Sequence, residues 1–204
     1  MAKAGKHGVT EATPKNIPFG AGTIHKGLKY SESSWNFDES IIGATSGGST
    51  LTITPELLDI EIDGANVKVK GLTKKTGETA RMEINFAEIS KDLIKSAVIG
   101  KDGTSNDTKY DLIESKVDIE TGDYLENIAF VGQLLDGRNI IVILDNALCT
   151  SGMELAGTAK ENGVLTLTFE SSAEITSDLD TLPYHIYYPK DAAMASVATS
   201  EAKG

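Results

Sequence analysis

The sequence has one cysteine and one tryptophan in 204 residues, and aromatic side chains make up only 6% of it. A single Cys149 excludes an internal disulfide framework and a zinc site built from cysteines. Because unpaired cysteine is among the most buried residue types, we expect Cys149 to be a small core side chain. The longest apolar run, Ile140–Leu144, has the length of a strand and is far below the roughly 20 residues that span a bilayer. The N-terminus has no apolar stretch behind its positive charges, so we expect no secretory signal, no membrane insertion and synthesis in the cytoplasm.

Basic residues are scarce as well. Nineteen lysines and arginines face thirty acids, which gives a formal net charge of −11. This balance argues against a protein that grips nucleic-acid phosphates. The acids gather in residues 102–126 and 136–191, and the simplest interpretation is a solvated acidic surface.

No constellation for catalysis is present. There is no G-x-S-x-G motif, and His7, His25 and His185 lie outside any motif, the latter two in strand-like stretches where a half-exposed position is the usual one. The glycine-rich stretch 43–50 lacks the Lys-Ser/Thr ending of a phosphate-binding loop. We therefore predict no enzyme activity, no catalytic residue, no cofactor and no metal site.

Turn signals predict antiparallel hairpins. Asp63-Gly64, Asp136-Gly137 and Asn162-Gly163 supply the positive φ that two-residue type I′ turns require. Each pair lies between β-prone runs, namely Leu57–Ile62 and Asn66–Leu72, Leu125–Leu135 and Asn139–Leu148, and Met153–Lys160 and Val164–Glu170.

Hydrophobic periodicity agrees with this interpretation. Apolar residues alternate with polar ones at positions 80–86, 165–170 and 50–54, as in strands with one buried face. Ser90–Ile99 instead has helical spacing, with Ser90 placed to cap its start and Gly100 placed just past its end. The predicted fold is mainly β, an antiparallel β-sandwich or rolled barrel with this one short flanking α-helix.

The expected organisation is one domain with two arms. Residues 1–16 form an N-terminal arm, residues 17–190 a single β-rich domain and residues 191–204 a C-terminal tail. Within the domain, Ser31–Gly48 reads as an extended loop or long ribbon and Lys101–Lys109 as a second polar loop.

Four stretches resemble the major tail protein, or tail tube protein, of siphophages infecting Gram-positive bacteria. They are Ile17–Gly27 (IPFGAGTIHKG), Ile41–Glu56 (IIGATSGGSTLTITPE), Asp59–Gly71 (DIEIDGANVKVKG) and Glu78–Ser90 (ETARMEINFAEIS). The resemblance covers residues 17 to 100, and the remainder of the chain is similar only in general character.

The resemblance implies a fold shared with the tube subunits of type VI secretion and a structural role in the virion tail. In that family six copies form a ring, and stacked rings form a tube through which DNA leaves the capsid without specific binding. The implied partners are further copies of the chain, the tape-measure protein and the tail terminator and baseplate proteins. Loops and terminal arms make contacts between rings, so the candidates here are Ser31–Gly48, with Trp35, Phe37, Ile41 and Ile42, the N-terminal arm and Ile186–Gly204.

Under this hypothesis the excess of acidic residues has a function. A lumen lined by carboxylates repels phosphate, whereas a basic lining would hold DNA. We expect some acids on alternating strands to face the bore, with Glu61, Asp63 and Glu83 as candidates.

Two other functions stay open. A carbohydrate- or protein-binding β-sandwich, of the lectin or adhesin type, would present exposed aromatic side chains near Trp35 and Phe37 or at Tyr184, Tyr187 and Tyr188. A hydrolase on a β scaffold would require Cys149 and His185 to meet.

Overall fold

The computed structural model describes residues 8–155, 163–177 and 179–190. Nearly all of its regular structure is antiparallel strand, flanked by short helices, which confirms the predicted mainly-β fold. The elements are η1 (Thr13–Lys15), β1 (Pro18–Lys26), β2 (Tyr30–Ser31), β3 (Ser34–Trp35), α1 (Phe37–Ser40), β4 (Thr45–Asp59), β5 (Thr73–Phe86), α2 (Lys91–Ala97), β6 (Gly100–Gly103), β7 (Leu112–Ser115), η2 (Thr121–Asp123), β8 (Leu125–Leu134), β9 (Asn139–Cys149), β10 (Leu165–Ser171) and β11 (Tyr184–Tyr187).

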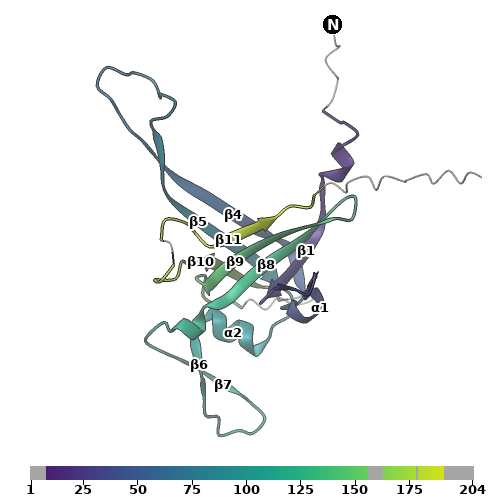
Figure 1. Cartoon of the computed structure of the whole chain (residues 1–204). Helices are drawn as coiled ribbons and strands as arrows, with labels where there is room; N and C mark the ends of the chain where they lie inside the picture. Colours follow the sequence, from purple (N-terminus) through teal and green to yellow (C-terminus); the bar gives the residue numbers. More distant parts are fainter. Residues whose placement is uncertain (1–7, 156–162, 178, 191–204) are drawn as a thin grey trace, which may run out of the picture.

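One large sheet organises the molecule. Its strands follow the order β1-β8-β9-β10-β5-β4, and β11 pairs with β9 beside β10. The sheet is rolled, so that β4, β5 and β10 cross over β1, β8 and β9 (Figure 1). Among the described residues no ladder joins β1 to β4, so the roll is open and sandwich-like and is not closed into a barrel.

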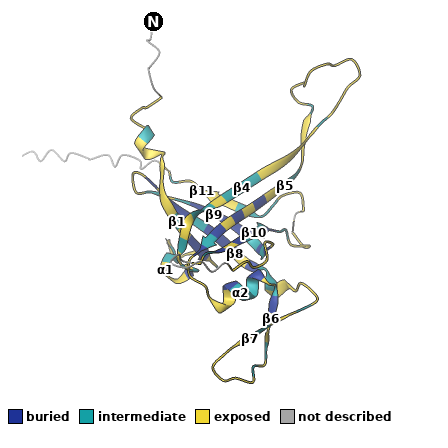
Figure 2. Cartoon of the chain, turned by 180° about the vertical axis from the view of Figure 1, so that it is seen from behind, coloured by how far each residue is buried: buried dark blue, intermediate teal, exposed yellow. Residues whose placement is uncertain are grey.

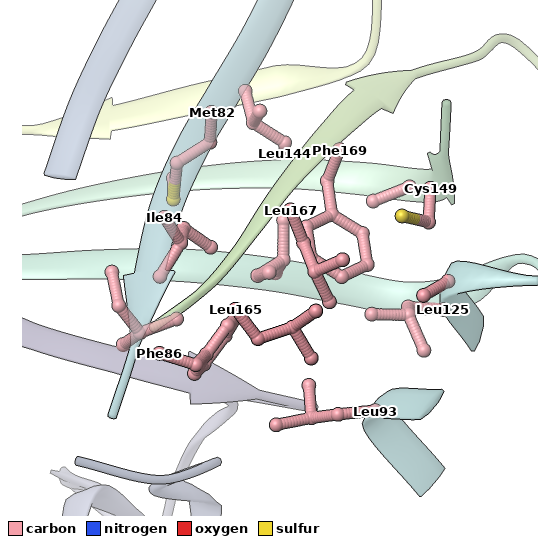
Figure 3. Close-up of a cluster of buried hydrophobic side chains, with 14 of the residues drawn as sticks. Met82, Ile84, Phe86, Leu93, Leu125, Leu144, Cys149, Leu165, Leu167 and Phe169 are labelled. Carbon is pink, nitrogen blue, oxygen red and sulfur yellow. The ribbon is translucent and has the colours of Figure 1, made fainter. Parts of the chain in front are cut away.

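The main core lies between the two halves of this roll (Figure 3). The alternation read from the sequence places one face of β5 and of β10 in it, since every second side chain of a strand points the same way. Helix α2 closes one end with Leu93 and Ala97. The side chains at most 2% exposed include Ala80, Met82, Ile84, Phe86, Leu165, Leu167, Phe169 and Cys149, so the prediction that Cys149 is buried is confirmed.

Residues Ile140–Leu144 of strand β9 are all apolar because both faces of the strand are covered there. Ile141 and Ile143 pack in a second cluster with Leu28, on the outer side of β8 and β9, while Leu144 and Ala147 belong to the main core. Simple alternation would put residues 144 and 147 on opposite faces. Asn146, with φ of 47°, reverses the alternation and lets β9 pass from one half of the roll to the other.

The segment that covers the second cluster is held by Asn127. The buried Asn127 amide accepts from the backbone N–H of Leu28 (2.9 Å) and donates to its carbonyl (3.2 Å), as a neighbouring strand would. Sequence patterning gave no sign of this residue.

The three predicted turns have different outcomes. Asp136-Gly137 joins β8 to β9 with φ of 88° at Gly137, which confirms that hairpin. At Asp63-Gly64 a turn is present, but the flanking strands end at Asp59 and Thr73, so the predicted strands 57–62 and 66–72 are wrong over most of their length. Asn162 lies outside the described residues, and residues 153–155 of the expected strand before it are not in a strand.

The predicted helix is confirmed with a shifted end. Ser90 caps α2 by accepting from the N–H of Leu93 (3.2 Å). The left-handed residue past its end is Ile99, with φ of 48°, and not Gly100. Gly100 begins β6, where a Cβ would lie 2.7 Å from the side chain of Ile113, so the glycine allows β6 and β7 to approach.

The two polar segments are more ordered than a loop. Residues 31–48 divide into the β2–β3 hairpin, α1 and the start of β4, and Lys101–Lys109 begins within the β6–β7 ribbon. Of the expected arms, residues 8–16 are described and contain η1, whereas 1–7 and 191–204 lie outside the described residues. No helix among the residues described is long and apolar enough to cross a membrane.

Candidate assembly interface

The outer edge of β4 is an unguarded strand edge. This 15-residue strand pairs with β5 on one side, and no described strand pairs with it on the other. Monomeric proteins protect such edges with lysines, inward charges or short strands, because the free N–H and C=O groups recruit further strands. Strand β4 contains no lysine or arginine, and its only deviations are Pro55 and register shifts between Thr45 and Ser49 and between Glu56 and Leu57.

Beyond the roll, β4 and β5 continue as a projecting ribbon, defined here as residues 55–77. Figure 2 shows this ribbon exposed along its length and leading away from the core. Its apolar side chains have no core to enter, since Leu57, Leu58, Ile60, Ile62, Val67 and Val69 are between 44% and 78% exposed. The exposed apolar side chains make the ribbon a candidate surface for contact with another molecule.

The candidate bore residues lie in two separate places. Glu61 and Asp63 are at the tip of the projecting ribbon, whereas Glu83 lies on β5, between Thr50 of β4 and Thr168 of β10. The strand pairing places Glu83 on the face of β4, β5 and β10 that points away from the main core. That polar face is formed by Thr50, Thr52, Thr54, Thr79, Arg81, Glu83, Asn85, Thr166, Thr168 and Glu170.

The polar face is rich in hydroxyl groups and has little net charge. Its only ionisable side chains are Arg81, Glu83 and Glu170, and Arg81 lies directly opposite Glu170 in the ladder. It offers no apolar or aromatic anchor for a partner. We expected acids to line the bore. On this face the only carboxylates are those of Glu83 and Glu170, and most of their neighbours are threonines.

The aromatic candidates form one cluster on the outer side of the roll. The ring centroid of Trp35 lies 5.0 Å from that of Tyr187 on β11, 5.3 Å from Tyr30 and 6.3 Å from Phe37. Trp35 and Tyr187, which are far apart in the sequence, thus meet. The half-buried Trp35 and Phe37 also pack against the second cluster. Trp35 meets Tyr187 and Tyr30 at interplanar angles of 75° and 59° and is stacked on Phe37 at 24°, so these rings pack against one another.

The other predicted contact residues are distributed unevenly. Ile41 is 52% exposed, whereas Ile42 packs against the main core and its N–H donates to the carbonyl of Ile24. Tyr184 is partly buried, and its hydroxyl donates to Glu78. Tyr188 is 55% exposed and donates to Asn16.

Cys149 and His185 do not form a catalytic pair. The thiol of Cys149 lies in the main core, where burial raises its pKa, and its neighbour is the Ser151 hydroxyl at 3.7 Å. His185 lies on β11, with Nε2 3.0 Å from Oδ2 of Asp145. Desolvation raises the pKa of Asp145, which the His185 contact opposes. No group of metal-ligating side chains occurs within the described residues.

The β6–β7 ribbon is a second projection, attached to α2 by ion pairs. Lys91 and Lys95 both contact Asp102, at 3.0 and 2.5 Å, and Lys91 also reaches Asp111 at 3.2 Å. These lysines hold the pKa of Asp102 below its usual value. Much of the acidity of residues 102–126 is therefore neutralised within the chain, since Lys116 similarly contacts Glu120 and Asp123.

His25 is the one titratable side chain on which the sequence interpretation was wrong. We expected a half-exposed residue, and it is 1% exposed. Nδ1 lies 2.8 Å from the Ser40 hydroxyl and Nε2 lies 2.7 Å from that of Thr23. The Ser40 hydroxyl donates to the Asn36 carbonyl (2.7 Å), so it accepts from Nδ1–H, and Thr23 donates to Nε2. The neutral ring thereby joins β1 to α1.

This arrangement predicts a loss of stability in acid. Burial lowers the pKa of His25 from 6.5, so the unfolded chain binds the proton more readily than the folded one. The stabilising contribution is complete above pH 6.5 and is lost as the pH falls through the lowered folded value. Urea unfolding followed between pH 7.5 and 5 should show a falling midpoint in the wild type and a weaker pH dependence in His25→Gln. Equal slopes in the two proteins would contradict the assignment.

Comparison with known proteins gives little further information. No family model and no curated protein matches the chain. Among solved structures, a chain from the virion of a native gene transfer agent particle matches with 10% identity and a TM-score of 0.43, over 76% of this chain and 92% of that one. A likeness at this level transfers neither fold nor function.

Proposed function

We propose that this chain is a structural subunit that assembles with copies of itself, as the tail tube protein of a long-tailed phage does. Six copies form a ring and stacked rings form the tail tube, the conduit for DNA ejection. The observation that carries the proposal is the free edge of β4, a 15-residue strand that has no lysine or arginine and whose edge is interrupted only at Pro55 and at two register shifts. The resemblance of residues 17–100 to siphophage tail tube proteins supports the particular assembly.

In the proposed assembly, the edge of β4, the projecting ribbon and the polar face have different roles. Pairing at the edge of β4 continues the sheet from one copy to the next, and a repeated heterologous contact of this kind closes into a ring. The projecting ribbon reaches away from the roll and contacts further copies with its apolar side chains. The polar face around Glu83 faces the bore, because it has no anchor for a protein partner and carries no excess of cationic groups that would retain phosphate.

The partners and location follow from this role. The tape-measure protein would occupy the bore during assembly, and the terminator and baseplate proteins would meet the two ends of the tube. The subunit would be made in the cytoplasm of the bacterial host and end in the virion tail. The enzyme hypothesis has no supporting geometry, since Cys149 and His185 are engaged elsewhere.

Concentration-dependent assembly tests the proposal. Sedimentation velocity and negative-stain microscopy of the full chain, over about a hundred-fold range of concentration, should show monomers giving way to rings or tubes of uniform diameter. As a control, Thr50→Lys with Thr54→Lys, at two exposed positions of β4, adds the lysines that protect strand edges in monomeric proteins and should stay monomeric with an unchanged urea unfolding midpoint. A wild-type chain that remains monomeric throughout, also when seeded with preformed tail ends, would sink the proposal.

A further inference from the structure

The two arms of the projecting ribbon carry opposite charge. The outgoing arm, residues 55–63, contains Glu56, Asp59, Glu61 and Asp63 and no basic residue. The return arm, residues 65–77, contains Lys68, Lys70, Lys74 and Lys75 and no acid. The ribbon as a whole is neutral, so this separation is not a consequence of the acidic composition of the chain.

Only part of this charge is used within the ribbon. Lys68 contacts Asp59, and with the Thr73 hydroxyl it lowers the pKa of that carboxyl. Lys75 contacts Glu78 at 2.8 Å, on the same strand. Glu61 and Asp63 on one arm, and Lys70 and Lys74 on the other, make no ion pair with another described residue.

Both sides of the ribbon are free for pairing. On the outgoing side, the edge of β4 has no described strand beside it. On the return side, β10 pairs with β5 only from Arg81 to Phe86, so no strand in the described part of the chain pairs with residues 73–80 on the side away from β4. In place of a strand, a groove of about 620 Å³ lies there, lined by Lys74–Glu78 and by residues 173 and 179–182.

This groove suits an incoming strand. One wall is the backbone of β5 from Lys74 to Glu78, and the other includes Leu179, which is 67% exposed, and Leu182. The groove also contains the acids Glu78, which pairs with Lys75, and Asp180, so the lysine in it that has no ion pair with a described residue is Lys74. The outgoing arm has a backbone edge without a described partner strand, and it carries the exposed side chains Leu57 and Leu58, which can pack in the groove. Main-chain pairing supplies the attraction, and side-chain complementarity sets which strand enters.

We infer that the acidic outgoing arm of one copy docks along the basic return arm of the next, in the groove beside Lys74–Glu78. The inference rests on the proposed self-assembly and specifies which surfaces meet. Opposite charges on the two arms make the contact directional. Contact between two outgoing arms would bring acid against acid, and contact between two return arms would bring base against base, so both are disfavoured. In the proposed assembly, Glu61 and Asp63 would then contact lysines of a neighbouring copy, and Glu83 would remain as the candidate of the three for the bore.

Two double variants test the inference by mixing. Lys68 and Lys75 already pair with Asp59 and Glu78, so the variants change the charges that have no ion pair within the ribbon. Lys70→Glu with Lys74→Glu makes positions 61, 63, 70 and 74 all acidic, and Glu61→Lys with Asp63→Lys makes these four positions all basic. All four residues are exposed and outside the core, so each variant should fold with the wild-type unfolding midpoint. Each alone should need about ten-fold or more protein to assemble, because like charges meet at every contact. An equimolar mixture should assemble near the wild-type concentration, as copies alternate around a ring with an even number of subunits.

The mixture separates contacts between copies from effects within one ribbon. In each ribbon of the mixture, positions 61, 63, 70 and 74 still carry charges of one sign, so rescue can arise only between molecules. Wild-type behaviour of either variant alone, or failure of the mixture, would overturn the inference while the proposed function stands. Failure of the wild-type chain itself to assemble would instead count against the proposed function. As a matched control, Asp107→Lys with Asp118→Lys, in the loops before and after β7, changes the charge equally and should not rescue the acidic variant.

Discussion

Replacement of residues 60–72 by the dipeptide Asn-Gly is expected to abolish assembly while leaving the subunit folded. Asp59 and Thr73 lie opposite one another at the ends of β4 and β5, so a two-residue type I′ turn can close the shortened hairpin. The change removes Ile60, Ile62, Val67 and Val69, which are exposed and contribute nothing to the core. The shorter connection should raise the free energy of unfolding by about 1–2 kcal/mol, because loop closure costs less entropy.

The measurement is light scattering or microscopy of the shortened chain beside the wild type, with urea unfolding as the check on the fold. A second variant, with Thr at positions 60, 62, 67 and 69, keeps the ribbon's length and charge and removes only its apolar surface. Both variants should remain monomeric at about ten times the concentration at which the wild type assembles. Normal assembly of the shortened chain would show that the ribbon is dispensable and would remove it from the account.

Lysines in place of the two carboxylates of the polar face are expected to give the assembled tube an affinity for DNA. Glu83→Lys with Glu170→Lys replaces both carboxylates among the threonines of the polar face, and the change is repeated in every copy of the assembly. Such a lining should retain duplex DNA at low salt. Its affinity should fall by about a thousand-fold or more between roughly 50 and 200 mM salt, as expected when six or more phosphates are contacted.

The control for this experiment carries the same charge change elsewhere. In Glu114→Lys with Asp118→Lys, the first position is on β7 and the second lies just after that strand, and tubes of this variant should bind no more DNA inside the bore than the wild type does. Filter binding with linear duplex, together with microscopy to locate the DNA, provides the measurement. Equal binding by the two variants, or DNA located only on the outside of the Glu83→Lys tubes, would place the polar face away from the bore.

The parts of the fold that sequence reasoning predicted are those with one buried face. Met82, Ile84 and Phe86 alternate with exposed side chains because β5 has a core on one side only, and period two is then visible in the sequence. Strand β9 is covered on both sides, so its apolar run gave a strand but no face. The reversal at Asn146 depends on strands β8 and β10, which no local pattern of β9 encodes.

The assembly surfaces show the same limit more strongly. The alternating residues Ile60, Ile62, Val67 and Val69 predicted strands, yet the strands end at Asp59 and Thr73, where the rest of the sheet is no longer beneath them. Residues 60–69 have the pattern of strands but pair with no described strand of their own chain, as expected of a segment that pairs between copies. Propensity alone cannot supply the missing neighbour.

Side chains that meet from distant parts of the chain were beyond prediction. Trp35 and Tyr187 were separate candidates for aromatic platforms, and the structure places them in one self-packed cluster. Asn127 and His25 hold the covering segment through hydrogen bonds to Leu28 and Ser40, and neither residue stands out in a periodic pattern. A buried polar residue can be recognised only when its partners are known.

The most direct test of the account is a cryo-electron microscopy reconstruction of particles assembled from the full chain. The account predicts a ring in which the outer edge of β4 pairs with a strand of the adjacent copy, with Glu83 on the surface that lines an axial channel. A particle in which the edge of β4 faces solvent, or in which the polar face of β4, β5 and β10 lies on the outside, would contradict it.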